Sequence, residues 1–150
     1  MTKATDVLQV IPHLVVDEAA AALDFYARAF DAKEEMRMQT PSGKMMHAAI
    51  SLGGHMVMLV DEFPEMGTVS PKTLGGSPVT IHLKVQNADE AVARAEAAGA
   101  KVRMPVSEQF WGDRYGVVED PFGHTWSIAH TVKQMSGDEM KAAGAAMAGA

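Results

Sequence analysis

Cysteine is absent from the 150-residue sequence. Its absence excludes disulfide bonds, thiolate catalysis and zinc sites built on cysteine. Lysine and arginine never form a run of more than two residues, and the formal net charge is −6 at pH 7. Because nucleic acids are bound through clustered positive charge, we expect no nucleic-acid partner.

Long apolar runs are missing as well. No stretch approaches the length needed to cross a membrane, and Met1–Asp6 contains no apolar core of a signal peptide. We therefore expect a soluble, cytoplasmic protein with no membrane partner. Apolar residues make up 47% of the chain and charged residues 21%, as in ordinary globular proteins, and the length suits one domain spanning residues 1–150.

The sequence does contain an internal repeat. The turn Asp120–Gly123 separates two apolar runs and predicts a hairpin, because proline fixes φ and glycine accepts positive φ. Gly123-His124 lies 69 positions after Gly54-His55, and the same shift places Ile81–Val85 on Pro12–Val16. The chain is therefore predicted to hold two copies of one unit.

Each copy reads as β-α-β-β-β, with the first copy at residues 7–60 and the second at 79–131. The segment 61–78 between them is rich in proline and glycine and lacks periodicity, so we interpret it as a linker, and 132–150 as a tail with a short helix. The predicted strands are 7–16, 32–39, 45–52, 56–60, 79–85, 101–107 and the two runs beside the 120–123 turn; the predicted helices are 17–31 and 87–99.

This pattern predicts an α+β fold. One helix covers only one face of a four-stranded sheet, so the two copies are expected to combine curved mixed sheets around a cup, with the helices outside. Unpaired strand edges and apolar faces on a chain of 16.0 kDa further predict a homodimer.

Four short motifs carry a resemblance to a known family: Asp24-Phe25-Tyr26, Met46-His47-Ala48, Phe110–Gly116 and Glu119–His124. Over residues 7–131 the chain resembles the vicinal oxygen chelate superfamily, which includes glyoxalase I, extradiol dioxygenases, fosfomycin-resistance enzymes and bleomycin-resistance proteins. The motifs are most similar to its PhnB-like branch. The resemblance implies two βαβββ units around a cup, while the activity varies within one fold.

In that superfamily the enzymes hold a divalent metal with two ligands from each unit. The resemblance places these ligand positions at Ile11, Met58, Thr80 and Ser127 of this chain. Isoleucine and methionine do not bind hard or borderline cations, and lone hydroxyls bind them poorly. We therefore expect no metal and no other cofactor at these positions, and we keep Met58 and Ser127 as ligand-contacting candidates.

His13 and His82 occupy equivalent places in the two copies. His13 comes two residues after Ile11, and His82 two residues after Thr80, which are two of the family ligand positions. Strand alternation therefore puts each histidine on the same face as that position. They are interpreted as ligand contacts, general bases or a relocated metal site, or else as hydrogen-bonded space fillers. His47 points either into the cup or away from it.

Trp111, Asp113, Arg114 and Tyr115 form a polar-aromatic segment. An aromatic plane, a carboxylate and a guanidinium suit stacking on and pairing with a small organic ligand, although an Asp–Arg pair could equally brace a loop. The adaptable side chains expected to line an apolar cup are Met36, Met38, Met56 and Met58. Asp120 is interpreted as a turn residue that accepts backbone hydrogen bonds, and Trp126 as a core residue.

Two functions follow from this pattern. The first is a metal-free module that binds a flat or amphipathic small molecule in the cup, as the resemblance to bleomycin-resistance proteins implies. The second is an enzyme, a lyase, isomerase or dioxygenase of the glyoxalase type, that uses a metal relocated to His13 and His82 or acid–base catalysis by these residues.

Overall fold

The structure, a computed structural model, describes residues 2–148. It contains two four-stranded sheets, four α-helices and one 3₁₀ helix. The elements are β1 His13–Val16, α1 Ala19–Phe30, β2 Lys33–Gln39, β3 Met45–Leu52, β4 His55–Asp61, η1 Pro64–Met66, α2 Pro71–Leu74, β5 Thr80–Lys84, α3 Ala88–Ala98, β6 Lys101–Glu108, β7 Asp113–Glu119, β8 Thr125–Thr131 and α4 Gly137–Ala148.

The two halves of the chain share one topology. The strand order is β1-β4-β3-β2 in the first sheet and β5-β8-β7-β6 in the second, and the first strand of each half runs parallel to the last. His13 pairs with Met58, and His82 pairs with Ser127. The 69-residue shift thus carries one ladder onto the other, and the predicted α+β fold of two βαβββ units is confirmed.

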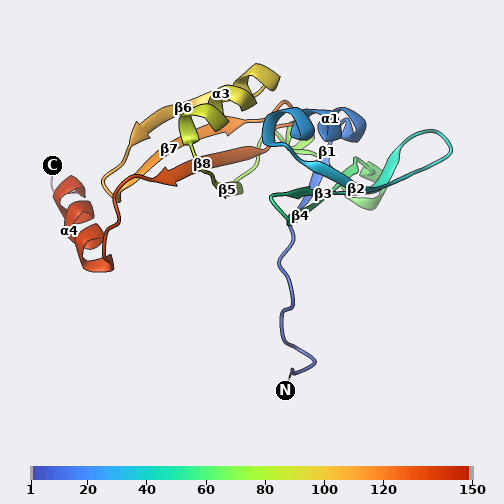
Figure 1. Cartoon of the computed structure of the whole chain (residues 1–150). Coiled ribbons are helices and arrows are strands. Elements are labelled where there is room, and N and C mark those ends of the chain that lie inside the picture. Colours follow the sequence, from blue (N-terminus) through green and yellow to red (C-terminus); the bar gives the residue numbers. More distant parts are fainter. Residues whose placement is uncertain (1, 149–150) are drawn as a thin grey trace.

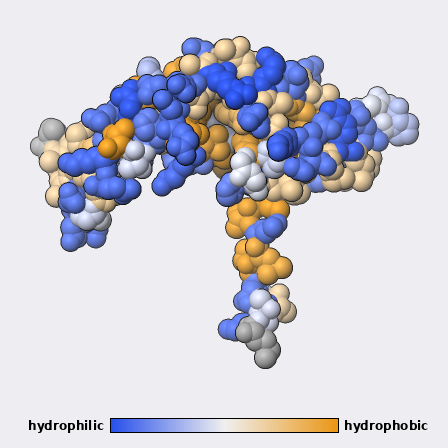
Figure 2. Space-filling model, viewed as in Figure 1, coloured by the Kyte–Doolittle hydropathy of each residue, from blue (hydrophilic) through white to orange (hydrophobic). Residues whose placement is uncertain are grey.

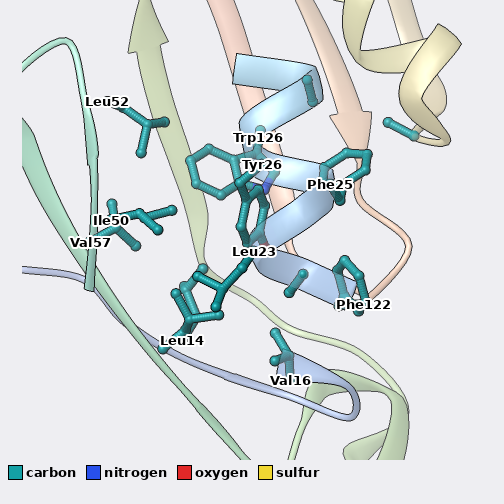
Figure 3. Close-up of a cluster of buried hydrophobic side chains, with 14 of the residues drawn as sticks. Leu14, Val16, Leu23, Phe25, Tyr26, Ile50, Leu52, Val57, Phe122 and Trp126 are labelled. Carbon is teal, nitrogen blue, oxygen red and sulfur yellow. The ribbon is translucent and has the colours of Figure 1, made fainter. Parts of the chain in front are cut away.

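Helices α1 and α3 lie over the outer faces of the sheets, which arch beneath them (Figure 1). The apolar stripe of α1 supplies the buried residues Leu23, Phe25 and Tyr26, which pack with side chains from both halves (Figure 3). Trp126 on β8 is fully buried in this cluster, as predicted. One continuous core therefore fixes the relative position of the two sheets.

A buried carboxylate ties the halves together inside this core. Asp120, only 3% exposed, accepts hydrogen bonds from the Tyr26 hydroxyl at 2.5 Å and from Trp126 Nε1 at 2.9 Å. Its other oxygen accepts the backbone N–H groups of Phe122 and His124, both at 2.9 Å. The expected turn contacts of Asp120 are confirmed, and the contact with Tyr26 adds a link between residues 94 positions apart.

The first strand is much shorter than the sequence predicts. The expectation of a strand over 7–16 is wrong, because β1 begins only at His13 and residues 7–12 form an extended arm. Val7, Leu8 and Val10 in this arm are 77–87% exposed. Figure 2 shows the arm as an apolar column that stands off the body. A high β propensity forms no strand where the chain offers no neighbouring strand to pair with.

The linker 61–78 is ordered by its own hydrogen bonds. It holds η1 and α2, and Glu62 accepts the hydroxyls of Ser70 and Thr73. These contacts lower the pKa of Glu62, with the Ser70 hydroxyl as the largest cause. The predicted helix in the tail is α4, and residues 149–150 of that tail lie outside the described part of the chain. Within residues 2–148, none of the helices has the length and apolar character needed to cross a membrane.

Candidate functional site

The concave face of each sheet is defined by strand alternation. Leu83 and Ile128 belong to the core side, so their neighbours His82 and Ser127 point to the opposite, concave side. Cross-strand pairing of Tyr115 with Ala129 places Tyr115 on that same side of β7. The second sheet therefore presents polar and aromatic groups on the face that no helix covers.

His82 is held in a defined orientation on this face. Its Nδ1 lies 2.6 Å from Ser127 Oγ, and its ring stacks on Tyr115 with centroids 5.9 Å apart and an interplanar angle of 20°. Ser127 is only 2% exposed, whereas His82 is exposed. The hydroxyl thus fixes the imidazole and leaves the other ring nitrogen available to a bound molecule.

Trp111 extends the aromatic surface beyond Tyr115. The two rings meet edge to face at 5.6 Å, and Trp111 Nε1 donates to Asp113 Oδ2 at 3.1 Å. The turn before β7 depends on Gly112, whose φ is +96° and whose position would bring an added Cβ within 2.2 Å of the Lys133 carbonyl oxygen. Glycine at this position lets the loop carrying Trp111 close against the chain that follows β8.

Arg114 lies on the opposite face of β7. Its guanidinium donates two hydrogen bonds, at 2.8 and 2.9 Å, to the carboxylate of Asp89 in the first turn of α3. The Arg114 side chain lowers the pKa of Asp89 through these hydrogen bonds. Arg114 thus lies on the opposite face of β7 from Asp113 and Tyr115. Its ion pair with Asp89 holds α3 against the sheet.

The concave face of the first sheet has a different character. His13 and Met58 are cross-strand partners, as are Met38 and His47, and the His13 and His47 rings lie 6.1 Å apart at 81°. The ladder places His47 on the concave side of β3, which is one of the two orientations that the sequence left open. This face is therefore built from imidazoles and thioethers rather than aromatic planes.

His13 and His82 lie in separate clusters. His13 has His47 as its aromatic neighbour, whereas His82 contacts Ser127 and Tyr115. Between the sheets lies a cavity of about 1120 Å³. Its lining includes the core-side residues Phe30, Ile81, Leu83, Trp126 and Ile128, residues 9–12 of the arm, and also His82 and Met56.

The four family ligand positions do not suit a divalent ion. Ile11 and Met58 offer no hard donor, and the hydroxyls of Thr80 and Ser127 are weak ones. Ser127 Oγ is already bonded to His82. Within residues 2–148 there is no group of three or more His, Cys, Asp or Glu side chains able to hold an ion.

Comparison with known proteins establishes the class. The model of the Glyoxalase/Bleomycin resistance protein/Dioxygenase superfamily matches residues 7–128, and the chain belongs to this superfamily. It is 52% identical over 135 residues to the Mycobacterium bovis protein Mb0911c, an alignment covering 88% of this chain and 89% of that protein.

Solved structures share the fold. The Arabidopsis thaliana At5g48480 product superposes with a TM-score of 0.65 at 29% identity, covering 83% of this chain and 99% of that one. The PhnB protein of Bacillus cereus gives a TM-score of 0.62 at 17% identity, covering 82% of this chain and 99% of its own. The resemblance drawn from the four motifs is confirmed for the superfamily, with a PhnB protein among the structural neighbours.

Proposed function

We propose that this protein binds a small, flat organic molecule on the concave face of the β5–β8 sheet. The observation that carries the proposal is the assembly of His82, Tyr115 and Trp111, three rings in contact on a face that no helix covers. Such rings bind planar molecules through apolar burial and stacking, and each aromatic contact contributes roughly 0.5–1.5 kcal/mol beyond the buried area.

Polar groups at the edge of the ring assembly would orient the ligand. Asp113 retains acceptor capacity beside the indole N–H of Trp111, and His82 presents the ring nitrogen that Ser127 does not contact. This mixture favours an amphipathic ligand with a planar apolar part and one or two hydrogen-bonding groups.

Binding of this kind uses no hard or borderline divalent ion at the base of the cup. The alternative function is a lyase, isomerase or dioxygenase of the glyoxalase type with a metal relocated to His13 and His82, and the separate environments of these residues argue against a shared ion. If the protein is an enzyme, acid–base catalysis by His82 is the better supported of these mechanisms, because the hydrogen bond with Ser127 orients the His82 ring.

We also infer that a second copy of the chain completes the cup. β1 and β5 are edge strands, residues of β5 line the cavity between the sheets, and the apolar arm 7–12 leaves its own body beside that cavity. In a two-fold dimer each arm can cover the cavity of its partner, which would bury Val7, Leu8 and Val10. The cytoplasmic location remains a prediction from the sequence.

Binding can be tested with a panel of naphthalene and quinoline carboxylates and amines, titrated against the protein by calorimetry. The proposal expects at least one member to bind, with Tyr115→Ala and His82→Ala each weakening it by roughly tenfold. Arg114→Gln, a change on the opposite face of β7, serves as the matched control and should leave the affinity unchanged. Equal affinity in Tyr115→Ala and the unchanged protein would refute the assignment of this face.

A further inference from the structure

The concave face of the first sheet concentrates sulfur and imidazole donors. The ladder places Met36, Ala49, Met58 and His13 in one row across β2, β3, β4 and β1. Directly paired residues point to the same face, with Cβ atoms about 5 Å apart. The row therefore brings two thioethers and an imidazole to one side, and the small side chain of Ala49 leaves space at its centre.

The adjacent row adds a second imidazole and a third thioether. Met38 pairs with His47 on the same face, and the His47 ring lies 6.1 Å from the His13 ring. With metal–nitrogen bonds of about 2 Å, two imidazoles that share one ion have centroids roughly 5–6 Å apart. The two rings thus stand at the separation that a shared ion requires, with Met58 beside His13.

These methionines are exposed where apolar side chains are usually buried. Met36, Met38 and Met56 are 41%, 46% and 38% exposed, and Met58 is half-buried. Isolated exposed methionines need no explanation, but four on one sheet face beside two histidines form a donor set. Soft thioether ligands select Cu(I) and similar ions, whereas carboxylates and carbonyls select magnesium, calcium and manganese.

We propose that His13, His47 and Met58 bind one Cu(I) ion per chain, with Met36 and Met38 as further thioether donors. Ile11 and Met58 stand where the enzymes of the family carry ligands for a divalent ion, and they cannot bind such an ion. The methionines and histidines on the same face are ligands suited to a soft monovalent ion. The chain has no cysteine, so no thiolate elsewhere competes for such an ion. This site is independent of the organic ligand proposed for the β5–β8 sheet.

The test uses Cu(I) in anaerobic competition with bicinchoninate, and Ag(I) as a redox-inert probe counted by native mass spectrometry. One ion per chain is expected. His13→Ala, His47→Ala and Met58→Leu should each weaken Cu(I) binding by about tenfold or more, because each removes one donor. Leucine preserves the volume of methionine, so Met58→Leu separates loss of sulfur from loss of packing.

Two variants outside this row serve as matched controls. His55→Ala removes a histidine at the start of β4, and Met66→Leu removes a 77% exposed methionine of η1, outside the first sheet. Both should bind Cu(I) as the unchanged protein does. In spectra of ¹³C-methyl methionine, the signals lost in Met36→Leu, Met38→Leu and Met58→Leu should be the ones that Ag(I) shifts.

Two results would overturn the proposal. One is the absence of a Cu(I) complex at micromolar protein concentration. The other is binding that falls equally in the Met66→Leu control and in Met58→Leu, which would show unspecific capture by scattered methionines. Failure of this site would leave the organic-ligand proposal untouched, because that proposal is tested by variants on β5 and β7.

Discussion

Removing the Tyr26 hydroxyl should destabilise the fold as a whole. The hydroxyl is buried and donates a 2.5 Å hydrogen bond to Asp120 Oδ2, which also accepts from Trp126 Nε1. Tyr26→Phe keeps the ring and its packing but takes away one of the four donors to this carboxylate. A hydrogen bond to a charged, buried group contributes about 1.5–3 kcal/mol, so we expect a loss of about 2 kcal/mol.

The measurement is the free energy of unfolding from urea titration at one fixed protein concentration, since association would shift apparent stability. For a chain of this length a loss of about 2 kcal/mol lowers the melting temperature by roughly 4–8 °C. Asp120→Asn should cost more than Tyr26→Phe, because the new amide places donors against the hydroxyl and the indole N–H.

Tyr115→Phe is the matched control. It removes a hydroxyl that makes no hydrogen bond within residues 2–148 and should change the free energy of unfolding by less than about 0.5 kcal/mol. If Tyr26→Phe proved as stable as the unchanged protein, the carboxylate would not be the link between the two halves, and the argument from buried hydrogen bonds would fail.

Burial, together with the charge and hydrogen bond of Asp120, raises the pKa of Tyr26 well above 10.0. As the pH rises, the Tyr26 hydroxyl therefore loses its proton in the unfolded chain before it does so in the folded one. The free energy of unfolding should fall above about pH 10 in the unchanged protein, and less steeply in Tyr26→Phe. Gly112→Ala, with φ at +96° and a Cβ 2.2 Å from the Lys133 oxygen, should cost at least about 2 kcal/mol in urea unfolding, and a smaller loss would contradict the close contact. Deletion of residues 2–11 should convert a dimer to a monomer in sedimentation experiments, whereas a monomeric unchanged protein would remove the role given to the arm.

The repeat in the sequence was the strongest guide to the fold. The 69-residue shift anticipated that His13 and His82 take equivalent ladder positions, because strand register follows the apolar pattern. Alternation along β8 also placed Trp126 on the core side, where it is buried. These features depend on the local alternation of apolar and polar residues, which can be read from the sequence.

Long-range contacts could not be predicted in the same way. The Tyr26–Asp120 hydrogen bond joins residues 94 positions apart, and no local pattern indicates that an Asp in a turn will meet a buried hydroxyl. The only signal was the presence of both residues in motifs that carry the family resemblance.

Arg114 illustrates how strand alternation divides a segment that the sequence presents as one group. Its segment was interpreted as one polar-aromatic group, yet β7 begins at Asp113, so alternation sends Arg114 and Tyr115 to opposite sides. The arm 7–12 was wrongly predicted as part of a strand. Its composition favours a strand, but within residues 2–148 it belongs to no sheet, and its contact with β4 is the hydrogen bond that the Pro12 carbonyl accepts from Met58 N–H at 2.9 Å.

The central claim is that the ring assembly on β5–β8 binds a planar ligand, and the chain's two tryptophans provide a direct test. In a ¹H–¹⁵N spectrum each indole N–H gives one signal, assigned by Trp111→Phe. On addition of the naphthalene or quinoline ligand that binds best, the Trp111 signal should move and that of the fully buried Trp126 should stay within a narrow range. A shift of the Trp126 signal with an unmoved Trp111 signal would place the ligand elsewhere and contradict the account.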